Sequence, residues 1–207
     1  MNDFDHPIFS ESLRRIRGWL GETGLAGLER DVLERLVHSG GDLSLAADLR
    51  FSPGACALGA GALAGGAPIL TDTAMAAAAV RPMARRTFGN PVRSVLDWAP
   101  PEAPPGGTRA AEGLAIALER HPGAVVLIGS APTALERLLR LTDTGAVPPP
   151  ALVIGMPVGF VGVMESKRRL ASRALPQIRL EGSRGGAALV AAAANALLRG
   201  AWRGPGP

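Results

Sequence analysis

The sequence predicts an α/β fold in which N-terminal helices precede a parallel sheet. Two observations indicate it. The first part of the chain has the apolar spacing of amphipathic helices, and from residue 68 onward short apolar runs alternate with segments of helical periodicity. This alternation is typical of parallel strands joined by crossover helices. The 207 residues suit one hydrophobic core and contain no marked boundary, so we expect a single domain over 1–207.

Three helices are expected before the first strand. The first begins at Pro7, and its apolar face is formed by Phe9, Leu13, Ile16 and Leu20. The apolar face of the second is formed by Leu25, Leu28, Val32 and Leu36. The third is short and rich in Ala and Gly, and we expect it to begin with Ser52 as N-cap and Pro53 in the first turn.

Five apolar runs predict strands at residues 68–71, 92–97, 124–128, 151–155 and 177–180. In open α/β sheets a ligand binds beyond the carboxyl ends of the strands, where loops and helix N-termini converge. The loops expected at that edge are 71–73 (TDT), 129–135 (GSAPTAL), 155–162 (GMPVGFVG) and 181–186 (EGSRGG).

The charge pattern argues against nucleic acid as a partner. The sequence pI is about 10.8, yet the formal net charge is only +4. Because Lys167 is the only lysine and there is no tyrosine, a small excess of arginine raises the pI steeply. The arginines are scattered, without the basic run of a nucleic-acid surface. Arginine suits instead a small ligand with several carboxylates, which its planar guanidinium binds in a bidentate manner.

Several other kinds of site are not expected. Cys56 is the only cysteine, which excludes an internal disulfide and a cysteine metal cluster, and the three histidines lack metal-ligand spacing. The glycines of 59–66 (GAGALAGG) follow no strand, so no dinucleotide cofactor is expected. The N-terminus MNDFDHPIF does not resemble a signal peptide, and no run is apolar enough for a membrane span. We therefore expect a cytoplasmic protein with no metal, cofactor or membrane partner.

Candidate binding groups lie in the loops, each with a plainer interpretation beside it. Ser130 is expected to cap a helix with Pro132 in its first turn, which leaves backbone donors open to an anion, although ordinary capping explains the same residues. Arg184 lies among glycines that let a ligand approach the backbone, although a lone loop arginine is usually solvated. Thr108 and Arg109 begin another helix, which is also the pattern of an N-cap followed by an exposed arginine.

His38 is the candidate for acid–base chemistry. It lies in the last turn of the second expected helix, before Gly40-Gly41. The helix end favours the imidazolium and desolvation opposes it, which predicts a pKa near neutrality. Such a group can give or take a proton. The alternative is a histidine that only forms hydrogen bonds at the helix end.

Seven segments, taken together, resemble the precorrin-8X methylmutase family, also called precorrin isomerases. They occur in the family's order and cover nearly the whole chain. PVGFVGxxESK, at 157–167, is the most specific of the motifs. The matching segments are HPIFSESLRRIR, LVHSGGDLSLAADLRFSPGA, GAPILTDTAMAAAAV, GTRAA, IGSAPTALERLL, PALVIGMPVGFVGVMESK and EGSRGGAALVAAAANAL.

The resemblance implies a three-layer α/β/α fold and an isomerase of cobalamin biosynthesis. The expected reaction moves a methyl group from C-11 to C-12 of the corrin ring and converts precorrin-8X to hydrogenobyrinate. Anaerobic relatives act on the cobalt-containing substrate. The family forms homodimers that bind the ring near the subunit boundary, and no external methyl donor is needed.

The resemblance also implies roles for individual residues. His38 matches the catalytic histidine, which would protonate the conjugated ring and promote a suprafacial 1,5-shift of the methyl group. Contacts with the tetrapyrrole or its carboxylate arms are expected from Arg109, Thr108, Ser12, Thr71, Asp72, Ser130 and Arg184.

Three positions depart from the family pattern. Ser130 replaces the usual asparagine, Ser183 stands where a second arginine is common, and Ser94 replaces a frequent cysteine. We expect changed binding detail rather than a changed reaction class, with one carboxylate contact weakened beside Arg184. Two other functions stay open: a carrier that holds hydrogenobyrinate and hands it to the next pathway enzyme, and a generic anion-binding α/β domain.

Overall fold

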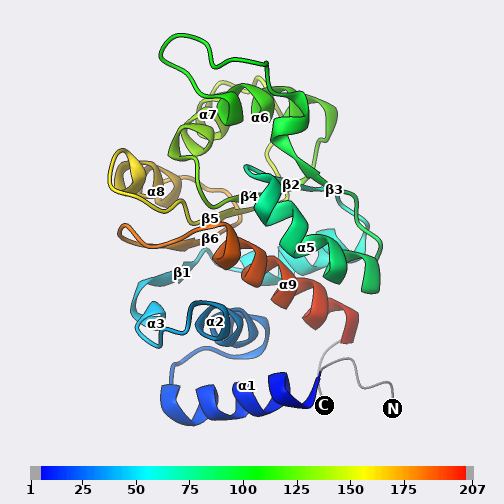
Figure 1. Cartoon of the computed structure of the whole chain (residues 1–207), viewed down its shortest axis with the longest axis vertical. Helices are drawn as coiled ribbons and strands as arrows, with labels where there is room; N and C mark the ends of the chain where they lie inside the picture. Colours follow the sequence, from blue (N-terminus) through cyan, green and yellow to red (C-terminus); the bar gives the residue numbers. More distant parts are fainter. Residues whose placement is uncertain (1–5, 204–207) are drawn as a thin grey trace.

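The computed structural model describes residues 6–203 and has an α/β architecture (Figure 1). The chain begins with two helices, α1 (Pro7–Leu20) and α2 (Gly27–Gly40), followed by the single-turn helix α3 (Leu45–Asp48). The later helices are α4 (Ala55–Ala64), α5 (Ala74–Arg86), α6 (Arg109–Arg120), α7 (Pro132–Asp143), α8 (Val163–Ala171) and α9 (Ala187–Arg203), with a 3₁₀ turn η1 at Val95–Trp98. The predicted order, helices first and strand–helix units afterwards, is confirmed.

The strands form one six-stranded sheet within the described residues. They are β1 (Leu49–Phe51), β2 (Ile69–Thr71), β3 (Val92–Ser94), β4 (Val125–Ile128), β5 (Leu152–Gly155) and β6 (Gln177–Leu180), in the spatial order β1-β6-β5-β4-β2-β3. β2 to β6 pair in parallel, as predicted, and β1 pairs antiparallel with β6 at the edge. β1 is absent from the sequence prediction because three residues with an arginine in the middle show no measurable periodicity.

Helices cover both faces of the sheet. One core lies under α6, α7 and α8 and includes Leu70, Val126 and Val153, whereas the other lies under α4, α5 and α9 and includes Ile69 and Val125. Neighbouring residues of a strand thus enter opposite cores, as the alternation of side chains along a strand requires. α2 packs on α9, and α1 packs on α2, so the N-terminal helices lie outside the three-layer sandwich (Figure 1).

Two expected boundaries are wrong, and in both a serine hydroxyl explains the difference. The third major helix begins at Ala55, because Ser52 accepts a hydrogen bond from the backbone N–H of Gln177 at 2.9 Å and so joins β6 instead of capping a helix. The strand expected at 92–97 ends at Ser94, whose hydroxyl accepts from the N–H of Leu96 at 3.3 Å and starts the 3₁₀ turn.

Close backbone contacts bring three loops together at the carboxyl edge of the sheet. The N–H of Met156 donates to the carbonyl of Ile128, and the N–H of Gly186 donates to the carbonyl of Met156, both at 2.9 Å. A Cβ at Gly185 would lie 1.9 Å from the carbonyl oxygen of Met156, so only glycine fits there. The loops after β4, β5 and β6 are therefore packed against one another.

Two kinds of feature are absent from the described part of the chain. Between residues 6 and 203, none of the helices has the length and apolar character that crossing a membrane requires. The same residues contain no cluster of three or more His, Cys, Asp or Glu side chains placed to hold a metal ion.

Candidate active site

His38 lies on the exposed side of the last turn of α2. The buried residues Val32, Leu33, Leu36 and Val37 direct the opposite side of this helix into the core. Gly41 follows as the C-cap with φ of +63°, and its N–H donates to the carbonyl of Val37 at 2.8 Å. This left-handed position ends the helix and turns the chain away directly after His38.

Two side chains of α1 fix the imidazole of His38. Its Nδ1 lies 2.8 Å from Oγ of Ser12, so the structure brings together two of the predicted site residues. The ring of Phe9 packs edge-on against the imidazole, with 5.0 Å between ring centroids and an interplanar angle of 85°. Because Nδ1 is engaged by Ser12, Nε2 is the ring nitrogen left to meet a ligand.

A buried carboxylate joins the two helices that carry this pair. Glu34 of α2 is fully buried and accepts hydrogen bonds from Nε of Arg17 at 2.8 Å and from Nε of Arg30 at 3.1 Å. Arg17 belongs to α1, so the ion pair ties α1 to α2 one turn away from Ser12 and His38. Burying a charge away from water is costly unless such partners replace the lost hydration.

The environment of His38 favours the neutral imidazole. Partial burial lowers its pKa below the ordinary 6.5, and the positive charge of Arg35 lowers it further. The Arg35 guanidinium lies 4.4 Å from the centroid of the Phe9 ring, on the same side of α2. Burial and the charge of Arg35 therefore outweigh the stabilisation of the imidazolium that the helix end was expected to provide. The imidazolium, once formed, is a stronger acid than that of an ordinary histidine.

The start of α7 differs from the sequence prediction. Ser130 is not the N-cap: Ala131 holds that position, without a side-chain hydrogen bond. Oδ2 of Asp72 accepts instead from the backbone N–H groups of Gly129, Ser130 and Ala131, at 3.1, 2.6 and 2.8 Å. The donors expected to be open to an external anion are thus occupied by a carboxylate of the chain itself.

Asp72 and Thr71 lie inside the protein at the end of β2. Asp72 is 2% exposed; burial raises the pKa of its carboxyl group, while the three backbone donors oppose that shift. Its Oδ1 is buried without a hydrogen-bond partner. The hydroxyl of Thr71 donates to the carbonyl of Thr73 at 2.8 Å. Both predicted site residues are therefore buried and form hydrogen bonds with the backbone of loops at the carboxyl edge of the sheet.

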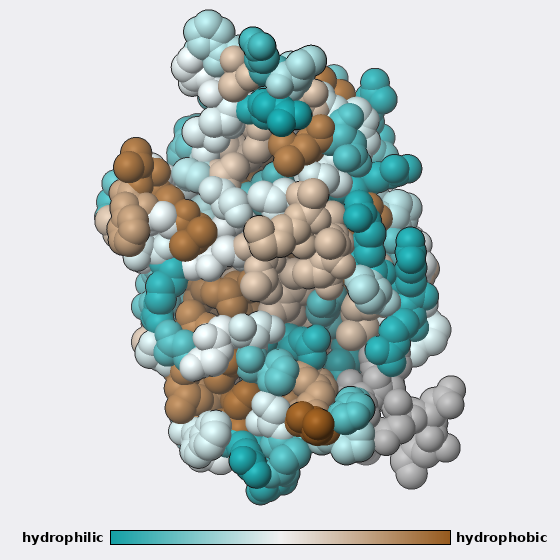
Figure 2. Space-filling model, in the orientation of Figure 1, coloured by the Kyte–Doolittle hydropathy of each residue, from teal (hydrophilic) through white to brown (hydrophobic). Residues whose placement is uncertain are grey.

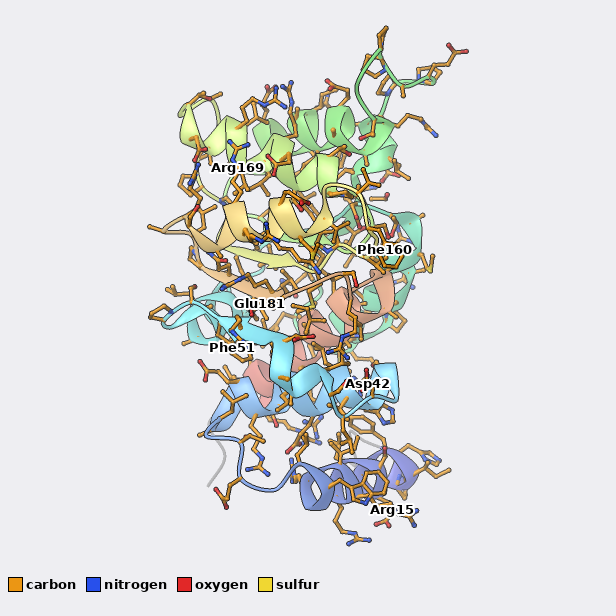
Figure 3. The ribbon with its side chains drawn as sticks, turned by 90° about the vertical axis from the view of Figure 1, so that its left-hand side faces the viewer. Arg15, Asp42, Phe51, Phe160, Arg169 and Glu181 are labelled. Carbon is orange, nitrogen blue, oxygen red and sulfur yellow. The ribbon has the colours of Figure 1, made fainter. Side chains whose placement is uncertain are left out.

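Arg184 is held by acidic side chains rather than surrounded by solvent. Its guanidinium donates to Asp42 and to Asp48, and Nη1 donates to Oγ of Ser44 at 2.7 Å. Asp42 directly follows the cap of α2, so this cluster joins the loop after β6 to the segment after His38. Figure 3 shows Asp42 and Phe160 on the same side of the molecule.

Thr108 and Arg109 lie at the start of α6, on the other side of the sheet from His38 (Figure 1). The Thr108 hydroxyl caps α6 and lies 2.8 Å from the hydroxyl of Thr133, at a hollow of about 560 Å³ that also includes Arg137. Arg109 is exposed, and its Nε donates to the carbonyl of Pro100 at 2.9 Å. One chain alone does not bring Arg109 to His38.

The tip of the loop after β5 belongs to the predicted edge loop 155–162, but its apolar residues are not among the predicted site residues. Phe160 and Val161 are 90% and 89% exposed, between Gly159 with φ of +134° and Gly162 with φ of +69°. Figure 2 shows apolar side chains projecting beside the paler central surface. Two apolar residues between two glycines were the available signal in the sequence, because glycine readily adopts the positive φ that a sharp turn requires.

Comparison with known proteins agrees with this architecture. The family model described as precorrin-8X methylmutase matches residues 7–200. A precorrin-8X methylmutase of Pseudomonas aeruginosa is 46% identical over 198 residues, covering 92% of this chain and 93% of the relative. A cobalt-precorrin-8 methylmutase of Synechocystis is 37% identical over 217 residues, covering 98% and 99%.

A solved structure gives the same result. The crystal structure of a precorrin-8X methylmutase from Thermus thermophilus superimposes with a TM-score of 0.85 at 39% identity, over 95% of this chain and 96% of that one. The family match and the relatives extend over the segments that carry His38, Asp72, Arg109 and Arg184. The chain therefore belongs to the precorrin-8X methylmutase family, a family of isomerases in cobalamin biosynthesis.

Proposed function

We propose that this isomerase moves the methyl group at C-11 of the corrin ring to C-12 and converts precorrin-8X to hydrogenobyrinate. The observation that carries the proposal is the His38–Ser12 pair, in which one ring nitrogen is fixed and the other is left for the substrate. Family membership supplies the substrate class, a tetrapyrrole with several carboxylate arms.

In the proposed mechanism, His38 gives a proton to the conjugated ring system and later takes one back. Protonation makes the ring electron-poor, and the methyl group migrates suprafacially by a 1,5-shift with the electrons of the bond that breaks. Loss of a proton to His38 then restores a neutral product, so substrate and product are isomers and no methyl donor is consumed. The low pKa of His38 favours rapid proton transfer to a weakly basic ring.

We propose that the ring binds at the carboxyl edge, with its carboxylate arms near Arg109 and Thr108 and with Ser12, Ser130 and Arg184 at its margin. Thr71 and Asp72 would act from beneath the surface by holding that edge. The apolar tip of Phe160 and Val161 would cover one face of the macrocycle, since its exposure on a free surface is unfavourable.

We further propose a homodimer with the ring near the subunit boundary. The placement of His38 and Arg109 on opposite sides of the sheet supports this, because a second copy can bring an Arg109 to the His38 of the first. We also propose that residues 1–207 act as one domain, since both cores share one sheet, and that the protein works in the cytoplasm, where the buried free thiol of Cys56 would stay reduced.

Labelled substrate tests the reaction directly. Precorrin-8X carrying ¹³C in the C-11 methyl group is incubated with the protein, and the product is examined by NMR. The expected result is one labelled methyl resonance at C-12. Unchanged substrate, in both the metal-free and the cobalt-containing forms, would contradict the proposal. Equal hydrogenobyrinate binding by wild type and His38→Ala, with no turnover by either, would favour the carrier function and product hand-over.

A further inference from the structure

The only lysine of the chain is buried beside the candidate site. Lys167 lies on α8 with 2% of its surface exposed. Its Nζ donates to the carbonyl of Gly182 at 2.8 Å and to the carbonyl of Arg184 at 2.6 Å. Both acceptors belong to the loop that follows β6, so the ammonium group bridges two carbonyls of this loop that are two residues apart.

The burial of this ammonium group needs compensation. Removing it from water is costly unless hydrogen bonds and opposite charge replace the lost solvation. Burial lowers the pKa of Lys167 to about 8, and the attraction of Asp48 opposes that shift. Two short hydrogen bonds to carbonyls offset the cost only while the loop keeps this conformation, so the lysine selects one arrangement of the loop.

The same loop reaches the segment that follows His38. Arg184 donates to Oδ2 of Asp42 at 2.6 Å and also binds Asp48. The N–H of Glu181 donates to the carbonyl of Asp48 at 2.9 Å. Asp42 is four residues beyond His38, directly after the cap of α2. A short path of contacts therefore runs from Lys167 through Arg184 to the end of α2.

On its other side the loop is attached to the carboxyl edge of the sheet. The N–H of Gly159 donates to the carbonyl of Ser183 at 3.0 Å, and the N–H of Gly186 donates to the carbonyl of Met156 at 2.9 Å. The end of α2 and the loop after β5 thus share one anchor. A change in this anchor would alter the position of His38 relative to the edge where the ring is proposed to bind.

We propose that Lys167 and Arg184 are positioning residues that hold the end of α2, and with it His38, against the carboxyl edge of the sheet. The consequence for catalysis rests on the proposed function, whereas the position of His38 can be tested without it. Arg184 would then act through Asp42 and Asp48 more than through a carboxylate of the substrate.

The test compares Lys167→Met, Arg184→Met and the double variant with Arg168→Met. Arg168 is the exposed neighbour of Lys167 on α8, so its variant controls for loss of a cation from that helix. The ring signals of His38, assigned with His38→Gln, are followed by NMR over pH, and kcat and KM are measured on precorrin-8X.

Both single variants are expected to shift the His38 ring signals in the same direction and to lower kcat about tenfold, while KM changes less than about threefold. The kcat of the double variant is expected to lie no more than about threefold below that of the less active single variant. The effects of residues that act through one contact path are not additive. Arg168→Met is expected to match wild type in all three measurements.

Folded variants whose His38 signals and kcat match those of Arg168→Met would overturn the proposal. The NMR measurement of the His38 position does not depend on turnover of precorrin-8X. A failure of the proposed function can therefore be distinguished from a failure of the positioning proposal. If Lys167→Met does not fold, Arg184→Lys serves as the second variant: it keeps one charge but loses the fork that binds two carboxylates, and it is expected to give an intermediate shift and rate.

Discussion

Oγ of Ser12 lies 2.8 Å from Nδ1 of His38, and this contact joins the first helix to the end of the second at the candidate active site. The two residues are separated by 26 positions in the sequence. Phe9, one turn before Ser12, packs edge-on against the imidazole. α1 therefore serves as the support that orients the proposed acid–base group, although it lies outside the α/β/α sandwich.

Removal of the Ser12 hydroxyl tests this support. Ser12→Ala deletes one hydrogen bond to Nδ1 and is expected to lower kcat about three- to tenfold, which corresponds to about 1 kcal/mol. Ser10→Ala, a change on the exposed surface of the same helix, is the control and is expected to leave kcat unaltered. The measurement is the steady-state rate of each variant on precorrin-8X. Equal rates for the two variants would show that Ser12 does not orient His38.

The pH dependence of the rate follows from the lowered pKa of His38. Because the proposed donor is the imidazolium, kcat/KM is expected to fall as pH rises through a pKa below the ordinary 6.5. Arg35→Gln removes a positive charge and is expected to move this pKa, and the falling limb, to higher pH. Arg168→Gln controls for net charge. An NMR titration of His38 beside the rate profile measures both, and a limb that stays in place in Arg35→Gln contradicts the assignment.

The same shift affects stability with a definite sign. Near pH 6 the unfolded chain binds more protons at His38 than the folded chain, so this residue contributes stability that rises with pH and is lost as pH falls below the unfolded pKa. His38→Gln is expected to remove that contribution. Chemical denaturation at pH 5 and at pH 8 measures the difference.

Asp72 is expected to matter for folding. In Asp72→Ala, the N–H groups of Gly129, Ser130 and Ala131 lose their common acceptor, which is expected to lower the free energy of unfolding by about 3 kcal/mol. Asp72→Asn keeps one acceptor oxygen and is expected to cost about 1 kcal/mol, since only the charge at the helix start is lost. Urea unfolding with the exposed Asp97→Ala as control gives both values; an Asp72→Ala midpoint equal to that of the control would exclude this role.

The apolar tip after β5 is expected to act in binding and not in folding. Phe160→Ser removes a ring that is 90% exposed, so the melting temperature is expected to stay within about 1 °C of wild type. Under the proposed function KM rises about tenfold, because an aromatic ring covering the macrocycle is lost. Leu58→Ala, an exposed apolar change on α4, is the control. A raised melting temperature with unchanged KM would argue against a contact with substrate.

The sequence predicted the parts of the fold that depend on local periodicity. The two N-terminal helices, the five parallel strands and the loops at their carboxyl ends all have apolar spacing or glycines that local rules recognise. β1 was not predictable in this way, since its three residues gain their strand conformation from β6, more than 120 residues later. The strand exists because of its partner.

The arrangement of the site depends on contacts that no local pattern contains. Asp72 caps the start of α7 from 57 to 59 residues away, so Ser130, the best local cap, is not needed. Arg184 pairs with Asp42, which is 142 residues away in the sequence. The local sequence around Arg184 predicted only that its side chain is solvated or binds a ligand. The sequence identifies the charged residues, whereas the groups with which they form hydrogen bonds and ion pairs are known only from the folded structure.

The most direct test of the proposed mechanism is the visible spectrum of precorrin-8X followed over time with wild type and with His38→Ala. General acid–base help contributes about 10²–10⁴ in rate, so His38→Ala is expected to form the hydrogenobyrinate chromophore at least about a hundredfold more slowly than wild type. Formation of the chromophore by His38→Ala at a rate within about tenfold of wild type would contradict proton transfer by His38.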